Sequence, residues 1–173
     1  VDYTATVATN SSYDSTPIKT GAGDDSITVE FTPPTSNNIY NWTLDLDGEA
    51  GSDAIIVDLT ATSVLSNEFV MSGGTGDDSI VLDLDALSAT NAWNTFDIDG
   101  GTGDDSIMVD MLATFYSNNM LNILGGAGND SINIDLMIST YYGWSSEGYT
   151  VDGGDGHDSI AMVFGHTASV SSY

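Results

Sequence analysis

The octapeptide Gly-Gly-Thr-Gly-Asp-Asp-Ser-Ile occurs twice in the chain, at residues 73–80 and again at residues 100–107. Its glycines permit a backbone with φ > 0 and let main-chain carbonyls approach a ligand closely, because no Cβ stands in the way. The acidic residues that follow add carboxylate oxygens. Carbonyl and carboxylate oxygens together are the ligands that a hard cation such as Ca²⁺ prefers. The octapeptide therefore indicates a turn that binds a small cation.

Variants of the octapeptide recur along the whole chain at intervals of 25 to 28 residues. The six turns begin at Thr20, Gly48, Gly73, Gly100, Gly125 and Gly153. A fixed period in the twenties is typical of solenoids, in which each repeat forms one coil that packs against its neighbours. We number the residues of each coil from the first residue of its turn, so that the octapeptide occupies positions 1 to 8.

An alternating strand follows each turn. Positions 8, 10 and 12 are apolar in every copy, and this period of two predicts a strand with one buried face. These positions hold Ile27/Val29/Phe31, Ile55/Val57/Leu59, Ile80/Leu82/Leu84, Ile107/Val109/Met111, Ile132/Ile134/Leu136 and Ile160/Met162/Phe164. A second strand precedes each turn, with the inward pairs Leu44/Leu46, Phe69/Met71, Phe96/Ile98, Leu121/Ile123 and Tyr149/Val151.

The sequence therefore predicts an all-β fold: a parallel β-solenoid with two short strands per coil and the glycine-rich turns along one edge. Variable loops at the opposite edge take up the length differences; they are residues 33–38, 63–67, 88–94, 116–119 and 139–148. We expect a single domain over residues 1–173, since that length suits one core. It would comprise a partial coil (1–19), five full coils (20–152) and a partial coil (153–173).

Position 6 is acidic in every turn, and position 5 is acidic in half of them. Stacked coils lie about 4.8 Å apart, so each set would form a file of charges that repel by roughly 1 kcal/mol per neighbouring pair in water. A cation between successive turns would convert that repulsion into coordination, and six turns leave room for about five Ca²⁺ ions. The predicted ligands are Asp25, Asp53, Asp78, Asp105, Asp130 and Asp158 at position 6, with Asp24, Asp77, Asp104 and Asn129 at position 5.

The turns at 73–80, 100–107, 125–132 and 153–160 resemble the repeats-in-toxin nonapeptide, in which glycine-glycine-x-glycine-x-aspartate precedes an aliphatic residue. The resemblance implies a calcium-binding β-roll whose chain is secreted unfolded and folds in external calcium. Two features depart from that family. Its motif recurs every nine residues, whereas here it recurs once per coil, so only one edge would bind calcium. Thr20 replaces the first glycine of its turn, and Glu49 replaces the second glycine of the next.

Composition excludes several classes of function. The net charge is -25, from 26 acidic residues against the single basic residue Lys19, and such a charge repels nucleic acid and anionic membranes. No apolar run is long enough to insert into a membrane. There is no cysteine for a disulfide or a thiolate site. No histidine, serine and carboxylate stand at an informative spacing, so we expect no enzymatic activity.

Two outward features are open to more than one interpretation. Position 11 carries the acidic file Glu30, Asp58, Asp83, Asp110 and Asp135, beside an apolar strip of Ile56, Val81 and Met108. The strip is either covered by a loop of the same chain or meets a neighbouring subunit, with the acidic file bridged by further calcium. Aromatic residues near the variable edge, including Trp42 and Trp93, either pack under loops or stack on a glycan.

The ends of the chain suggest assembly. The chain begins partway through a coil and ends after one strand of another, and neither end carries a recognisable cap. Uncapped solenoid ends expose strand edges that pair with further strands. We therefore expect an extracellular or cell-surface structural protein that assembles with copies of itself, either end to end alone or also laterally, into a filament or surface layer. The alternative is a calcium-stabilised segment of a large secreted adhesin, with a glycan or surface partner, or of an exported enzyme.

Overall fold

The computed structural model describes residues 2–6, 17–31, 38–61, 63–89, 93–115, 119–140 and 148–166. Within these ranges all regular structure is β, and no helix there could span a membrane. The strands are β1 (Asp2–Thr6), β2 (Ile18–Lys19), β3 (Ser26–Phe31), β4 (Asn38–Tyr40), β5 (Thr43–Asp47), β6 (Ala54–Ala61), β7 (Ser63–Leu65), β8 (Glu68–Thr75), β9 (Ser79–Ala89), β10 (Asn94–Thr102), β11 (Ser106–Phe115), β12 (Asn119–Ala127), β13 (Ser131–Thr140), β14 (Gly148–Asp155) and β15 (Ser159–His166).

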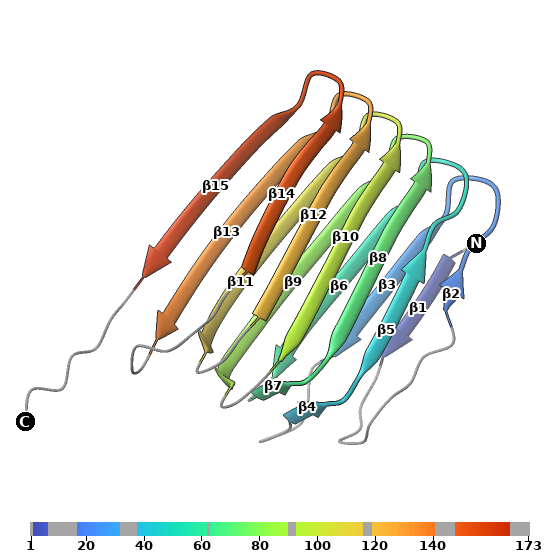
Figure 1. Ribbon diagram of the computed structural model, residues 1–173. Coiled ribbons are helices and arrows are strands. Elements are labelled where there is room, and N and C mark those ends of the chain that lie inside the picture. The colour runs from blue at the N-terminus through green and yellow to red at the C-terminus, as the bar shows by residue number, and fades with distance from the viewer. Residues whose placement is uncertain are drawn as a thin grey trace, which may run out of the picture.

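Two parallel sheets form the solenoid, as the sequence predicts. Sheet A has the order β1-β3-β6-β9-β11-β13-β15 and holds the strands that follow the turns. Sheet B has the order β14-β12-β10-β8-β5-β2 and holds the strands that precede them. Figure 1 shows the two sheets as facing layers, with the turns that join them aligned along one edge and the colour advancing coil by coil. The predicted fold class is confirmed.

The repeat fixes the register of the sheets. Equivalent positions pair from coil to coil, so that Ile27, Ile55, Ile80, Ile107, Ile132 and Ile160 form one continuous row. A slip by one residue would turn every inward side chain outward, so the buried face itself enforces this register.

The predicted inward positions form the core between the sheets. Positions 8, 10 and 12 are buried in the five coils from β3 to β13. From sheet B, the rings of Phe69 and Phe96 stack with centroids 4.9 Å apart. Trp42 also belongs to the core, since it is 2% exposed and its ring meets that of Phe31 edge-on at 5.2 Å.

The last described coil differs from the others. Ile160 and Phe164 occupy inward positions of β15, yet they are 48% and 55% exposed. The reason is geometric, because β15 is the terminal strand of sheet A and β14 is the terminal strand of sheet B. This end of the described stack therefore presents apolar side chains and two strand edges.

Several details go beyond the sequence prediction. The short strands β4 and β7 pair with each other in a third, two-stranded sheet near the variable edge. The strands of sheet A reach 11 residues in β9, longer than the short strands that we predict. The predicted partial coils at 1–19 and 153–173, and four of the five variable loops, lie partly outside the described residues.

Candidate metal-binding turns

The turns carry the aspartates of position 6 into the interior. Asp25, Asp53, Asp78, Asp105 and Asp130 form one file along the edge of the solenoid and are at most 7% exposed. Asp158, in the last turn, continues the file and is partly exposed. Position 6 has the same parity as the apolar positions 8, 10 and 12, so its side chain points to the same side of the chain.

One oxygen of each buried carboxylate joins neighbouring coils. The backbone N–H of Asp53 donates to Oδ1 of Asp78 at 2.7 Å, and that of Asp78 donates to Oδ1 of Asp105 at 2.8 Å. Equivalent bonds of 2.7 to 3.0 Å occur in the other intervals of the file. The position-6 side chains from Asp53 to Asp158 thus each satisfy an N–H of the preceding coil.

The second carboxylate oxygen has no such partner. Oδ2 of Asp53, Asp78, Asp105 and Asp130 is buried and accepts no hydrogen bond. It packs against the position-1 glycine of its own turn, where the carbonyl oxygen of the next coil also converges. A Cβ added at Gly73 would lie 2.5 Å from both Asp78 Oδ2 and Gly100 O. The position-1 glycines do not have a positive φ, so their backbone conformation does not require glycine. Glycine is required there because a Cβ would clash with the two oxygens.

Position 5 points the other way. Asp24, Asp77, Asp104 and Asn129 are exposed, and their Oδ1 atoms accept backbone N–H groups from the following coil at 2.7 to 3.1 Å. At the same position of the second turn, the hydroxyl oxygen of Ser52 accepts the backbone N–H of Asp77 at 3.3 Å. The structure therefore separates the two sets of predicted ligands. Position 6 presents buried oxygens without donors, and position 5 presents exposed oxygens that already cap a turn.

A neutral file runs along the opposite edge, and the sequence analysis does not anticipate it. Asn67, Asn94 and Asn119 are buried, and each Oδ1 accepts the backbone N–H of the preceding coil. The carboxamide N–H groups of Asn67 and Asn94 donate to the next asparagine at 3.1 and 2.9 Å. The signal in the sequence is an asparagine two residues before the first inward residue of a sheet B strand.

The first interval between turns is built differently. Thr20 replaces the position-1 glycine, and its hydroxyl donates to Gly48 O at 2.8 Å, so this carbonyl is already hydrogen-bonded. Lys19 forms ion pairs with Asp47 and, at 3.5 Å, with Glu49 of the next coil. The hydrogen bond that Lys19 donates to Asp47, together with the charges of Asp47 and Glu49, raises the pKa of Lys19. Glu49 has a φ of 68°, at the position where glycine has a φ of 91° to 111° in the other turns.

Burial makes the charge of the position-6 file costly. Burial, aided by the charges of Asp78 and Asp130, raises the pKa of Asp105 from 3.8 to about 6, although the hydrogen bond from the Asp78 backbone N–H lowers it. Burial also raises the pKa of Asp53 and Asp78. Lys19 is the one lysine or arginine of the chain, and it is paired with Asp47 and Glu49. Without a bound cation, these carboxylates therefore lose their charge by binding a proton.

The oxygens at the turns fit a hard cation. Four successive intervals repeat the same pair, a buried Oδ2 and the position-1 carbonyl of the next coil: Asp53 with Gly73, Asp78 with Gly100, Asp105 with Gly125, and Asp130 with Gly153. No three acidic, histidine or cysteine side chains converge anywhere in the described residues. Any site here would thus combine few carboxylates with backbone carbonyls, a donor set that Ca²⁺ accepts.

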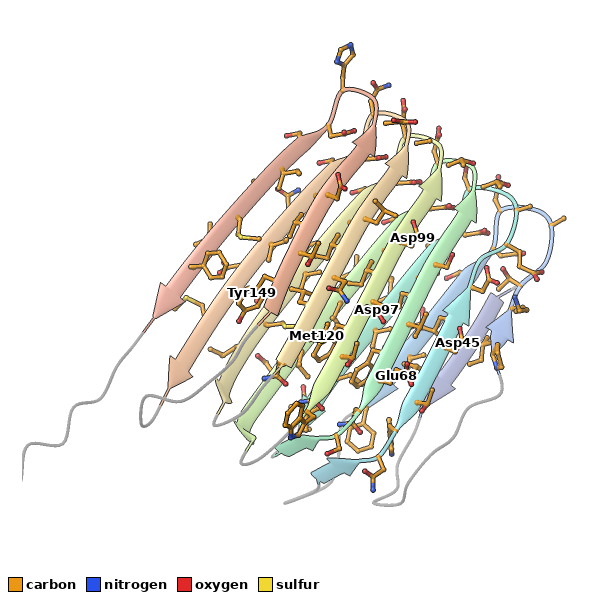
Figure 2. The ribbon with its side chains drawn as sticks, in the orientation of Figure 1. Asp45, Glu68, Asp97, Asp99, Met120 and Tyr149 are labelled. Atoms are coloured by element: carbon orange, nitrogen blue, oxygen red, sulfur yellow. The ribbon has the colours of Figure 1, made fainter. Side chains whose placement is uncertain are left out.

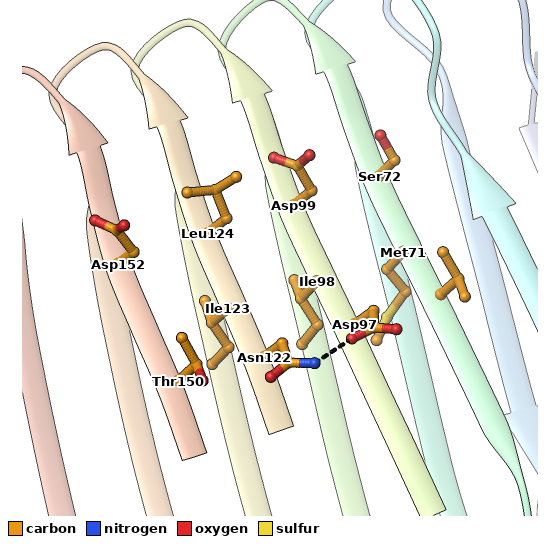
Figure 3. A pocket seen from close by; sticks show the side chains of 11 residues that line it. Met71, Ser72, Asp97, Ile98, Asp99, Asn122, Ile123, Leu124, Thr150 and Asp152 are labelled. Atoms are coloured by element: carbon orange, nitrogen blue, oxygen red, sulfur yellow. Dashed lines mark hydrogen bonds between the residues drawn. The ribbon is translucent and has the colours of Figure 1, made fainter. Parts of the chain in front are cut away.

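The outer faces of both sheets are also acidic. On sheet A the file Glu30, Asp58, Asp83, Asp110 and Asp135 is exposed, and burial together with Asp110 and Asp58 raises the pKa of Asp83. Ile56 and Met108 beside it are 38% and 47% exposed, so no described segment covers the apolar strip. Sheet B carries a shallow depression of about 490 Å³ over β8, β10, β12 and β14, where Asn122 donates to Asp97 at 2.6 Å (Figure 3).

Comparison of the chain with protein-family models, with curated proteins and with solved structures found no match. The geometry of the turns therefore has to support a function by itself.

We predict that Gly73→Ala destabilises the protein whereas Gly148→Ala does not. The new Cβ at residue 73 would stand 2.5 Å from two oxygens, whereas at residue 148 its nearest neighbour is Met120 Cγ at 3.8 Å. Overpacking of this kind costs about 1–3 kcal/mol. Denaturant unfolding of both variants in the same buffer measures the difference. Equal stability of the two variants would contradict the close approach at position 1.

We also predict that, in chelator, the folded state loses stability as the pH rises from about 4 through about 6. The raised pKa of Asp105 means that the folded chain holds a proton that the unfolded chain has released. The stabilising effect is complete below the unfolded pKa and is lost above the folded one. Thermal unfolding across this range should show a smaller decline for Asp105→Asn, which keeps the surface charges. An unchanged decline in that variant would contradict the raised pKa of Asp105 and assign the effect to other carboxylates.

Proposed function

We propose that the chain is a calcium-binding extracellular structural protein whose stacked coils close only when cations neutralise the position-6 file, and which assembles end to end into a filament or surface layer. The observation that carries this proposal is the file itself. Four consecutive buried carboxylate oxygens lack a hydrogen-bond donor, and each faces the carbonyl of the next coil. The resemblance of the turns to repeats-in-toxin motifs supports the same metal.

Asp53, Asp78, Asp105 and Asp130 would hold the metal together with the carbonyls of Gly73, Gly100, Gly125 and Gly153. Bound Ca²⁺ would supply the positive charge that these turns lack. The first interval needs none, because Thr20 occupies the carbonyl there and Lys19 supplies a positive charge from the chain. The proposal is therefore four ions in this set of intervals, one fewer than the number of intervals between the six turns.

The donor set also supports an extracellular location. Calcium affinity rises with the number of charged ligands and with the rigidity of the site, and weak sites with dissociation constants of about 10⁻⁴–10⁻³ M serve outside cells. An interval that offers one donor-free carboxylate oxygen and a carbonyl belongs to the weak end of this range. Because the metal binds only the folded stack, its binding energy becomes folding energy.

The exposed end of the stack supports assembly. Ile160 and Phe164 occupy inward positions but are exposed at the end of the described stack, where β14 and β15 also present strand edges. A further coil in the same register would bury these side chains and continue both sheets. In the proposed function a second copy of the chain supplies that coil. In the alternative, a calcium-stabilised segment of an adhesin or exported enzyme, a longer chain supplies it.

The calcium proposal predicts that the wild type binds about four ions and loses its strands in excess chelator. The variant with Asp53, Asp78, Asp105 and Asp130 all changed to Asn should keep its strands without metal. Its carboxamides could donate to the position-1 carbonyls, as the asparagines of the opposite edge donate within their own file. Circular dichroism and isothermal titration calorimetry measure both effects. A wild type whose strands survive chelation would overturn the proposal.

The assembly proposal predicts filaments or sheets of the calcium-loaded chain in negative-stain microscopy. Phe164→Asp should abolish them, because it places a charge on the end face. Val163→Asp is the matched control, since Val163 is 57% exposed on the outer face, in the row of the acidic file. Calcium-loaded monomers of the wild type would reject assembly and favour the longer-chain alternative.

A further inference from the structure

Trp93 is the most exposed large apolar side chain in the described part of the chain, at 68%. It directly precedes β10 and stands next to Asn94 of the buried asparagine file. Large aromatic side chains usually gain stability by burial, as Trp42 does at the inward position that Asn67 and Asn94 occupy in the next two coils. An indole that is open to solvent offers a flat apolar face on which a ligand ring can stack.

The indole borders a depression of about 430 Å³ at the variable edge of sheet B. Three successive coils line it: Asn41 and Thr43 from the first, Ser66 and Glu68 from the second, and Trp93 and Thr95 from the third. Glu68 is flanked in register by Thr43 on one side and Thr95 on the other. Beneath them, the backbone N–H of Trp42 donates to Asn67 Oδ1 at 2.8 Å, so a hydrogen bond of the asparagine file holds the backbone under the depression.

The lining combines one flat apolar surface with several hydrogen-bonding groups. Thr43, Ser66 and Thr95 offer hydroxyls, and Asn41 offers a carboxamide. Glu68 is exposed and offers a carboxylate whose two oxygens are available to hydroxyl donors of a ligand. A pyranose ring has the matching chemistry, since one face carries C–H groups and its rim carries hydroxyls. We propose that this depression is a glycan-binding site in which Trp93 stacks on a sugar ring and Glu68 accepts its hydroxyls.

Charge narrows the class of glycan. The chain carries a net charge of -25, and Glu68 lies in the depression itself, so acidic sugars would be repelled. A quaternary ammonium ligand would need several aromatic faces around it, and Trp93 is the one exposed aromatic ring that lines the depression. The site therefore takes an uncharged glycan.

The surface also favours an oligosaccharide over a single sugar. Along β10, Thr95 lines this depression, and the next outward residues, Asp97 and Asp99, line the neighbouring depression of about 490 Å³. Figure 2 shows Glu68, Asp97 and Asp99 together on the strands of sheet B, and Figure 3 shows Asp97 beside Asn122 in the second depression. A glycan that stacks on Trp93 can thus continue over further polar groups.

The test is glycan binding by the full calcium-loaded chain on an array of neutral and acidic glycans, followed by titration of the strongest neutral binder as its di-, tetra- and hexasaccharide. We expect neutral glycans alone to bind, with affinity rising with length. Trp93→Ala and Glu68→Gln should each weaken binding at least about tenfold. Met108→Ala, an exposed side chain on the opposite sheet, is the matched control and should bind as the wild type does.

Circular dichroism of each variant shows that the fold is retained, so that a loss of binding reports on the site. The inference is overturned if no neutral glycan binds the folded wild type, if Trp93→Ala binds as tightly as Met108→Ala, or if choline competes for the site. It is independent of assembly and of the number of ions, because a monomer with any ion content can be titrated once its strands are formed.

Discussion

A carboxylate buried against a backbone carbonyl is the constraint on which this structure depends. Along the turn edge, Oδ1 of the position-6 aspartates from Asp53 to Asp158 accepts the backbone N–H of the preceding coil. Oδ2 lies beside the position-1 glycine, near the carbonyl of the next coil, and has no donor in four successive coils. At the opposite edge, buried asparagines join successive coils instead, and their carboxamides donate hydrogen bonds as well as accept them. Asparagine would thus suffice for a permanent stack. Aspartate makes the stack conditional on a proton or a cation.

That condition links composition to the proposed role. A chain with one lysine cannot neutralise its own interior, and the lysine that it has serves the single interval in which threonine replaces glycine. The remaining intervals depend on the surroundings. Under the proposed function, the carboxylates would oppose closure in a calcium-poor compartment and favour it in a calcium-rich one, so folding would follow the passage of the chain to the exterior. The charges outside the core then keep the folded stack soluble and repel nucleic acid and anionic surfaces.

The solenoid also explains where further interactions can arise. Equivalent residues of successive coils stand side by side, so a single outward position becomes a row, as in the acidic file on sheet A. At the end of the described stack no further coil follows, so Ile160 and Phe164 are exposed whereas the equivalent residues of the preceding coil are buried. Residues that break a row stand out for the same reason. Trp93 is one of these, since the equivalent positions of the two preceding coils hold the small polar residues Asn41 and Ser66.

The sequence by itself determined the period, the two strands of each coil and the register, because an alternating apolar pattern repeated at fixed spacing has one arrangement that buries every apolar residue. Parity even implied that position 6 points inward with positions 8, 10 and 12. The tertiary structure alone decided which oxygens of the predicted ligands are left without donors, that position 5 caps the following coil, and that Thr20 and Lys19 complete the first interval. These depend on contacts between residues 25 to 28 apart, and a pattern within one turn carries no information about the partner that stacking brings to it.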